Sequence, residues 1–315
     1  MPTVPKIGPR RQHLVSNFYL KHFADDQQRI NVFDLRHQRT WNSKTKDAMV
    51  ENHIYTLPTD APDLRYALEN ALGEIETDAA PVIQTVVDQQ NLTGIRRDLL
   101  ALWMAAQLKR SSLIGDHIKQ VNLLMSDPCV GLQIVENNRG ALIRKFGEKA
   151  VEEYVIRIRK GESAASLSTG QTILFGLEKI GMYATSICEM HWTLEVSRSE
   201  GFLTSDNPVF VRRRGISKDH YLVGVARKDL DAELHFPISP TLFLIGKWRR
   251  SRESKRRVST WRVRELNRMT ILCSNRQIAY SPKTELDKGL IDDCASFRLN
   301  IFDVPGFVDG FRLSN

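Results

Sequence analysis

The sequence contains little cysteine. Its four cysteines, Cys129, Cys188, Cys273 and Cys294, are far apart and include no Cys-x-x-Cys pair. Zinc knuckles and disulfide frameworks both need cysteines at close, regular spacing, so neither is predicted. We expect four reduced, buried thiols.

Long apolar runs are also missing. Charged residues or glycine interrupt every apolar stretch well before the ~18 residues that a membrane-spanning helix needs. The opening residues, Met1-Pro2-Thr3-Val4-Pro5, lack the apolar core of a signal peptide. We therefore expect a soluble, cytoplasmic protein.

Several catalytic signatures are absent from the sequence. It has no phosphate-cradling glycine loop, no Gly-x-Ser-x-Gly elbow, no His-Glu-x-x-His motif and no dinucleotide fingerprint. These absences argue against nucleotide hydrolysis by a P-loop, serine hydrolysis of the elbow type and zinc proteolysis.

Positive charge is abundant. The chain of 315 residues has a formal net charge of +8, and its pI is about 9.3. A summed positive field attracts anions, so we expect an anionic partner, with nucleic acid favoured over a membrane surface or an acidic protein. Much of the excess lies in residues 247–257, where Arg249, Arg250, Arg256 and Arg257 are candidate substrate contacts. The alternative is a solvated loop or hairpin tip.

The hydrophobic pattern changes period along the chain. Apolar residues alternate over 29–35, then recur at helical spacing from Leu64, Leu68 and Leu72 onward, and alternate again after His191. One domain, 1–315, is predicted, with an N-terminal strand segment (1–62), a helical subdomain (63–190), a C-terminal sheet (191–282) and a C-terminal tail packed on the core (283–315).

This order of elements predicts an α+β fold. Strand segments lie on both sides of a helical insertion, so we expect the N-terminal and C-terminal strands to form a mostly antiparallel sheet. The helices between them should form one layer on that sheet. Within this scheme Pro81 is expected to begin a new helical turn, and residues 258–263 to form a strand.

Several short motifs follow one another along the chain, each occurring once. They are Gln12-His13, Phe18-Tyr19-Leu20-Lys21-x-Phe23, Tyr55, Ile75-Glu76, Gln107-x-x-Arg110, Thr204-Ser205-Asp206-Asn207-Pro208 and Pro237-x-Ser239-Pro240. In order and spacing the chain resembles, over residues 12–282, the largely bacterial family catalogued as domain of unknown function 4238 (DUF4238). The sequence departs from that pattern at Val15-Ser16, where proline is common, and in the arginine-rich stretch. The family has no assigned activity, so the resemblance supports the extent of the domain and the choice of candidate residues.

Three titratable side chains are candidate catalytic residues. His13 can serve as a general base because its ordinary pKa is near neutrality. Asp206 follows a predicted strand and could deliver a carboxylate to the strand end, whereas Glu76 lies on the helical layer. The alternatives are a histidine tied to backbone and an Asx-type turn at Asp206 without catalytic function.

Four further residues are candidate substrate contacts. Gln107 and Arg110, spaced i, i+3, share one helix face and can present an amide and a guanidinium together. Arg110 can clamp a phosphate, but it can equally form an inter-helix ion pair with Glu76. Gln12 and Asn207 complete the set, through their ability to hydrogen-bond a ligand.

Two functions follow from these candidates. The first is a nuclease or other phosphodiesterase acting on RNA or DNA, in which the candidate residues meet in a polar cleft between helices and sheet, with a divalent metal as one option for the cofactor. The second is a non-catalytic nucleic-acid-binding or protein-interaction module that uses residues 247–257, with Trp248 or Trp261 stacking on bases.

Overall fold

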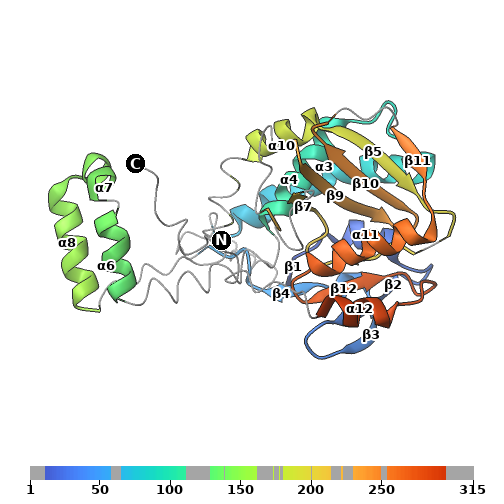
Figure 1. Ribbon diagram of the computed structural model, residues 1–315, viewed down its shortest axis with the longest axis horizontal. Helices are drawn as coiled ribbons and strands as arrows, with labels where there is room; N and C mark the ends of the chain where they lie inside the picture. The colour runs from blue at the N-terminus through green and yellow to red at the C-terminus, as the bar shows by residue number, and fades with distance from the viewer. Residues whose placement is uncertain are drawn as a thin grey trace, which may run out of the picture.

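The fold is α+β, as predicted (Figure 1). The computed structural model describes residues 11–57, 65–110, 128–137, 139–161, 173, 177, 180–199, 201–213, 221–222, 230–249 and 254–295. Helices and strands occur in mixed order, and the strands form three separate sheets.

The largest sheet has six strands in the order β11-β5-β10-β9-β7-β8. The strands are β5 (His191–Val196), β7 (Phe210–Arg213), β8 (Tyr221–Leu222), β9 (Ala232–Ser239), β10 (Leu242–Lys247) and β11 (Lys255–Arg257). Their pairing is antiparallel except for β11, which runs parallel to β5. Almost every residue of β9 and β10 is buried, which explains the near-continuous apolar sequence of β10, while β9 also buries the polar residues His235 and Ser239.

A second sheet joins the two ends of the chain in the order β3-β2-β12-β6. Its strands are β2 (Arg29–Asp34), β3 (Arg39–Lys44), β6 (Thr204–Ser205) and β12 (Gln277–Tyr280). The N-terminal hairpin therefore pairs with a late strand, as expected. The prediction of one shared sheet was too simple, because the six-stranded sheet contains only strands that lie after residue 190.

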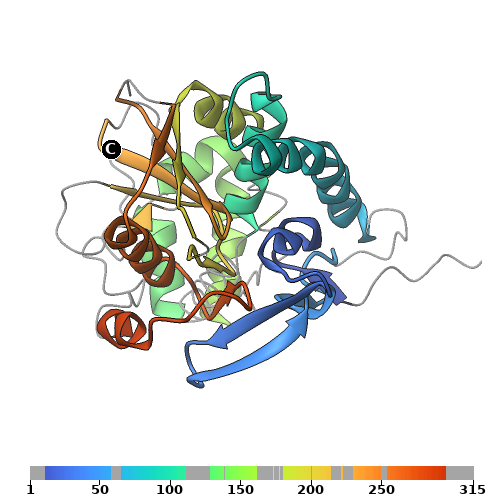
Figure 2. The ribbon, with the colours of Figure 1, turned by 90° about the vertical axis from the view of Figure 1, so that its right-hand side faces the viewer.

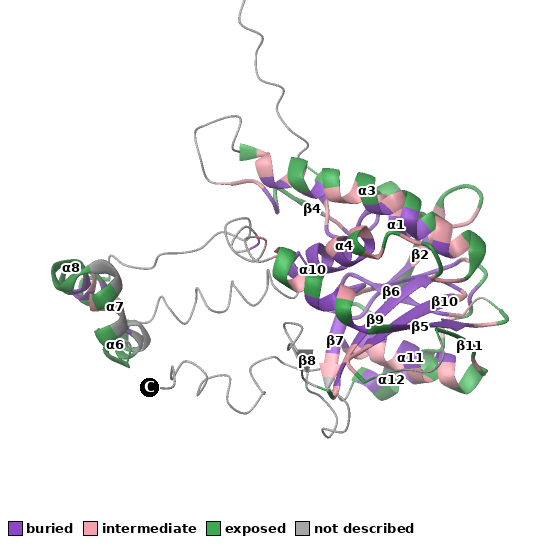
Figure 3. Cartoon of the chain, turned by 90° about the horizontal axis from the view of Figure 1, so that it is seen from above, coloured by how far each residue is buried: buried purple, intermediate pink, exposed green. Residues whose placement is uncertain are grey.

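Helices lie on both sides of the large sheet (Figures 2 and 3). On one side are α1 (Asn17–Leu20), α3 (Ala67–Gln89), α4 (Arg97–Lys109) and α10 (Ile180–Glu189); on the other are α11 (Thr260–Leu272) and α12 (Lys288–Ala295). Of the helices predicted between the strand segments, α3, α4 and α10 lie on one side of this sheet, and the later helices α11 and α12 cover the other. Two local predictions were also wrong: Pro81 lies inside the continuous helix α3, and Thr260 already begins α11.

A third group of helices has its own small core. It consists of α6 (Pro128–Asn137), α7 (Arg139–Phe146) and α8 (Glu148–Arg159), which contact one another. Their buried side chains form a cluster distinct from the cores of the sheets, made of Val135, Val151, Val155 and Ile158. None of the described side chains of these helices belongs to the large apolar cluster, although the sequence places the helices in the same helical subdomain.

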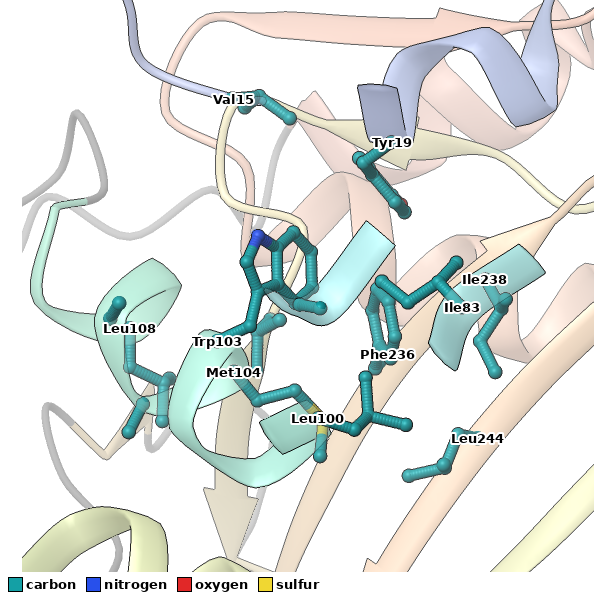
Figure 4. Close-up of a cluster of buried hydrophobic side chains, with 14 of the residues drawn as sticks. Val15, Tyr19, Ile83, Leu100, Trp103, Met104, Leu108, Phe236, Ile238 and Leu244 are labelled. Carbon is teal, nitrogen blue, oxygen red and sulfur yellow. The ribbon is translucent and has the colours of Figure 1, made fainter. Parts of the chain in front are cut away.

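The main core packs α3 and α4 onto the large sheet around three aromatic rings (Figure 4). The ring centroid of Trp103 lies 5.4 Å from that of Tyr19 and 5.2 Å from that of Phe236. The Tyr19 hydroxyl is 2.6 Å from Thr204 Oγ1 and donates a hydrogen bond of 2.5 Å to the Pro237 carbonyl. Tyr19 therefore links the N-terminal segment to strands of both large sheets.

Three other expectations concern the surface and the end of the chain. Cys273 and Cys294 are buried, but Cys129 is exposed and Cys188 half-buried, so the prediction of four buried thiols was wrong for these two. Helix α12 packs against the core through Leu290 and Ile291, whereas the part of the predicted tail from 296 to 315 lies outside the described residues. Of the helices that the structure describes, none is long and apolar enough to cross a membrane.

Candidate functional site

A short two-stranded sheet positions the first candidate residues. Strand β1 (Arg11–His13) pairs antiparallel with β4 (Val50–Asn52), which sets Gln12 opposite Glu51 and His13 opposite Val50. Alternation along a strand sends these two side chains to opposite faces. Gln12 is completely buried, and its Oε1 accepts a hydrogen bond of 2.7 Å from the Tyr55 backbone N–H.

Arg110, immediately after α4, is the centre of a buried polar cluster. Its side chain is only 2% exposed and its Nη1 lies 2.5 Å from Glu76 Oε1 on α3. Its Nε donates to Gln107 Oε1 at 2.7 Å and its Nη2 to Ser16 Oγ. The predicted Glu76–Arg110 ion pair is present, and Gln107 shares the face of Arg110 as its spacing indicated. Burial lowers the pKa of Arg110, but the charge and hydrogen bond of Glu76, together with Tyr55 and Glu69, outweigh this, so the pKa is raised and the guanidinium stays charged.

The same cluster fixes the backbone that follows His13. Gln107 Nε2 donates to the Leu14 carbonyl at 3.0 Å, and Trp103 Nε1 donates to Ser16 Oγ at 3.2 Å. The Tyr55 hydroxyl donates to the His13 carbonyl at 2.9 Å. Because α4 and Tyr55 bind this segment from two directions, the position of His13 is determined by tertiary contacts.

His13 is held in its neutral form. Burial lowers its pKa from the ordinary value, and the positive charge of Arg110 acts in the same direction against the opposing effect of Glu76. A backbone hydrogen bond with Lys46 engages the ring. Its Nε2 is buried and has no hydrogen-bond partner in the described structure. A neutral imidazole with a bare nitrogen is equipped to accept a proton.

Glu69 is a member of the cluster that the sequence did not reveal. Burial and the nearby charge of Glu76 raise its pKa to about 7. Its Oε2 is also buried, with no hydrogen-bond partner among the residues described. Glu69 lies two helical turns before Glu76 on α3, and a search for acidic residues at i−7 from Glu76 would have found it.

Asp206 and Asn207 lie outside the polar cluster and bind backbone groups of residues 273–277. The carboxylate of Asp206 accepts backbone hydrogen bonds from Asn275 at 2.9 Å, Arg276 at 2.8 Å and Gln277 at 3.1 Å. Asn207 Nδ2 donates to the Cys273 carbonyl at 2.8 Å. Both side chains thus bind the turn between α11 and β12. His13 was predicted to lie beside Asp206, whereas the charged groups near it are Glu76 and Arg110. The catalytic and binding roles assigned to Asp206 and Asn207 stay predictions.

The arginine-rich stretch is largely engaged in ion pairs. Arg249 Nη2 lies 2.9 Å from Asp231 Oδ1, and Arg256 pairs with the buried carboxylate of Glu195. Arg257 is exposed at the end of β11, whereas Arg250 lies outside the described residues. The stretch is therefore partly an edge strand tied into the large sheet, and less of its charge is free than the sequence suggested.

The cluster is better suited to proton transfer than to holding a metal. Within the described ranges there is no group of three or more histidine, cysteine, aspartate or glutamate side chains arranged to hold a metal ion. What the cluster does bring together around Glu76 and Arg110 is a neutral imidazole and a carboxyl group that titrates near neutrality. Groups with pKa values displaced in this way are typical of functional sites.

Comparison with known families shows which family the chain matches. A family model described as "Protein of unknown function (DUF4238)" matches residues 11–284, which include the whole polar cluster. Comparisons with curated proteins and with solved structures gave no match.

Proposed function

The chain belongs to the DUF4238 family, whose description assigns no function, and from the geometry of the polar cluster we propose that it is a phosphodiesterase that cleaves RNA by general acid–base catalysis. RNA carries its own nucleophile, the 2′-hydroxyl group, so a correctly placed base and acid suffice for cleavage. The positive net charge of +8 favours such a polyanionic substrate.

One observation carries this proposal. His13 Nε2 and Glu69 Oε2 are both buried with no hydrogen bond of good geometry among the described residues, and both side chains lie within the electrostatic influence of Glu76 and Arg110. Gln12 Nε2 is a third such atom, and the Gln12 side chain lies beside Glu69, where it opposes the rise in the pKa of that carboxyl group. Leaving a buried polar atom unpaired costs about 1–3 kcal/mol, so three in one cluster call for an explanation. A substrate that hydrogen-bonds to His13 Nε2 and Glu69 Oε2 supplies it.

The proposed reaction assigns one role to each side chain. His13 Nε2 takes the proton from the 2′-hydroxyl, whose oxygen attacks the adjacent phosphorus. The bond from phosphorus to the 5′-oxygen breaks, and that oxygen receives a proton from Glu69. The products are a 2′,3′-cyclic phosphate and a free 5′-hydroxyl. Glu76 and Arg110 are positioning residues, because their ion pair sets the charge around both groups.

Access to the site requires movement. The two unpartnered atoms are closed off from solvent, so an RNA strand reaches them only when the surrounding chain opens. Closure around a bound substrate then excludes water, which strengthens electrostatic interactions within the site.

The direct test uses matched labelled substrates. The purified protein is incubated with an RNA and with the 2′-deoxy strand of the same sequence, each with and without Mg²⁺ or Mn²⁺. We expect RNA cleavage that leaves 2′,3′-cyclic phosphate ends and leaves the deoxy strand intact. Glu69→Gln and His13→Gln should each lower the rate by about 10²–10⁴-fold, whereas Glu74→Gln, at an exposed position of the same helix, should not.

The pH profile separates this mechanism from others. His13 acts only when deprotonated and Glu69 only when protonated, so activity should rise with pH as His13 loses its proton and fall again around pH 7 as Glu69 ionises. Undiminished cleavage by both variants, or equal cleavage of the deoxy strand, would refute the proposed chemistry.

A non-catalytic nucleic-acid-binding module using residues 247–257 is the second candidate. The exposed Trp261 supports this candidate, because Arg212, Lys247, Arg256 and Arg262 line the same pocket. The ion pair of Arg249 with Asp231 weakens it in its simple form, whereas Arg256 pairs with Glu195 and still lines a pocket beside α11.

A further inference from the structure

A second site lies on other elements of the fold. A pocket of about 480 Å³ opens beside the large sheet and α11, and it includes side chains of β7, β9, β10 and β11. Four cationic side chains line it: Arg212, Lys247, Arg256 and Arg262. None of β1, α3 and α4, which build the polar cluster, contributes a lining residue, so this site is separable from the proposed catalytic one.

Carboxylates hold three of these four cations in place, and Arg212 contacts the Met269 sulfur. Lys247 Nζ lies 2.9 Å from Glu233 Oε1, and Arg262 Nη1 lies 2.8 Å from Glu265 Oε2. Arg256 and Arg262 both bind Glu195, whose side chain is only 1% exposed. Four cations against these three carboxylates leave one net positive charge at the pocket. The paired cations are thereby pre-organised, which lowers the entropic cost of binding an anion.

An exposed indole stands at the same pocket. Trp261, in the first turn of α11, lines the pocket and is 72% exposed. A single exposed aromatic side chain is common on protein surfaces, so what distinguishes this indole is its position beside the cationic side chains of the pocket. A flat ring next to guanidinium and ammonium groups matches a ligand that combines a planar base with a phosphate, because bases stack on aromatic rings and phosphates bind arginine.

We propose that this pocket binds a nucleoside phosphate, with the base stacked on Trp261 and the phosphate held by Arg256 and its neighbouring cations. The volume of about 480 Å³ lies within the range of small-molecule sites, which suits a single nucleotide. The site lies beside α11, which Figure 3 shows on the side of the large sheet opposite α3 and α4.

Calorimetric titration of the full chain tests this with three probes: AMP, adenosine and inorganic phosphate. We expect AMP to bind at least about tenfold more tightly than either fragment, since each fragment keeps only one of the two contacts. Trp261→Ala and Arg256→Gln should each weaken AMP binding about tenfold. Arg264→Gln is the matched control, because Arg264 is an exposed, ion-paired arginine of α11 that does not line the pocket. Thermal melting of each variant verifies that it is folded.

Three outcomes overturn the proposal. The first is an absence of AMP binding at millimolar concentration. The second is phosphate binding as tight as AMP binding and insensitive to Trp261→Ala, which indicates an anion site without a base contact. The third is a single-stranded oligonucleotide that binds far more tightly per nucleotide than AMP, which indicates a strand-binding surface. RNA cleavage by the Trp261→Ala variant reports separately on the polar cluster, so failure of one proposal is distinguishable from failure of the other.

Discussion

Arg110 shows how one side chain can organise a site from residues that are distant in sequence. It connects Glu76, Gln107 and Ser16, which come from three different segments. A buried guanidinium is tolerated only when its donors and charge are matched, and here the match comes from all three partners at once. The integrity of the cluster therefore depends on this residue.

Replacing Arg110 with methionine should destabilise the protein by about 3 kcal/mol, because it leaves Glu76 and Gln107 without their partner in a mostly buried place. Urea unfolding measures the loss. Arg96→Met is the matched control: Arg96 also pairs with a carboxylate, but its side chain is 66% exposed, so we expect a much smaller loss of stability than for Arg110→Met. Equal losses in the two variants would contradict the role assigned to Arg110.

The raised pKa of Glu69 predicts how the free energy of unfolding depends on pH. Its pKa is raised to about 7 in the folded protein, so the folded state holds a proton that the unfolded state releases at lower pH. The protonated Glu69 contributes its full stabilisation below the ordinary carboxyl pKa. That stabilisation is lost progressively as the pH rises from the ordinary pKa to about 7. Between about pH 5 and pH 8 the wild type should lose on the order of 1 kcal/mol more than Glu69→Gln, a value discounted for the partial exposure of the group.

Urea midpoints of both proteins at the two pH values provide the measurement for Glu69. Titration of all other groups is common to the two proteins and cancels in the comparison. Parallel pH dependence of wild type and variant would show that Glu69 titrates as an ordinary surface carboxyl group.

The sequence predicted part of the polar cluster around Arg110, namely the part that depends on local helical geometry. The i, i+3 spacing of Gln107 and Arg110 follows from helical geometry alone, and the prediction of a shared face was correct. The pKa of Glu69 could not be predicted, because it depends on burial and on the position of Glu76 in the folded protein. The polar segment around Asp206 resembled a functional turn in sequence. Only the structure revealed that the Asp206 carboxylate binds three backbone N–H groups.

Among the elements, the turn between α11 and β12 depends on a side chain from a distant strand. Asp206 follows β6 and satisfies the N–H groups of residues 275–277, which hold the turn in place. Asp206→Asn removes one of the two accepting oxygens along with the negative charge. We expect a loss of about 2 kcal/mol, since hydrogen bonds to charged groups are stronger than neutral ones.

Chemical unfolding measures this loss, with Asp78→Asn as control at an exposed position of α3, where a change within about 0.5 kcal/mol is expected. If Asp206 instead acted in catalysis, the substitution would abolish RNA cleavage while leaving stability unchanged. A turn-stabilising role gives the opposite pattern.

Element boundaries illustrate where local signals fail. Pro81 was expected to begin a new turn, yet α3 continues through it, because apolar residues on both sides of it, such as Ala79 and Ile83, are buried in the same core. Residues 255–257 were expected in a loop or hairpin tip, yet they form an edge strand, since Glu195 on the neighbouring strand binds Arg256. In both places tertiary contacts outweigh local propensity.

Across the whole molecule, the pairing of the two chain ends was predictable and the division into sheets was not. Alternating apolar residues predicted strands at both ends, and β2 does pair with β12. Alternation identifies a strand but not its neighbours, so it could not show that β2 and β12 form a sheet separate from β9 and β10.

The small core of α6, α7 and α8 predicts that these helices unfold separately from the sheets. Their buried cluster is distinct from the main core, so little free energy couples the two. Val155→Ala removes buried methyl groups from that cluster and should lower the opening free energy of α6–α8 amides by about 1–3 kcal/mol. Amides of β9 and β10 should keep their protection in native-state hydrogen exchange. Leu244→Ala, in the main core, is the matched control and should lower protection in both strands. Loss of protection in β9 and β10 on changing Val155 would instead indicate one cooperative unit, as the single-domain prediction requires.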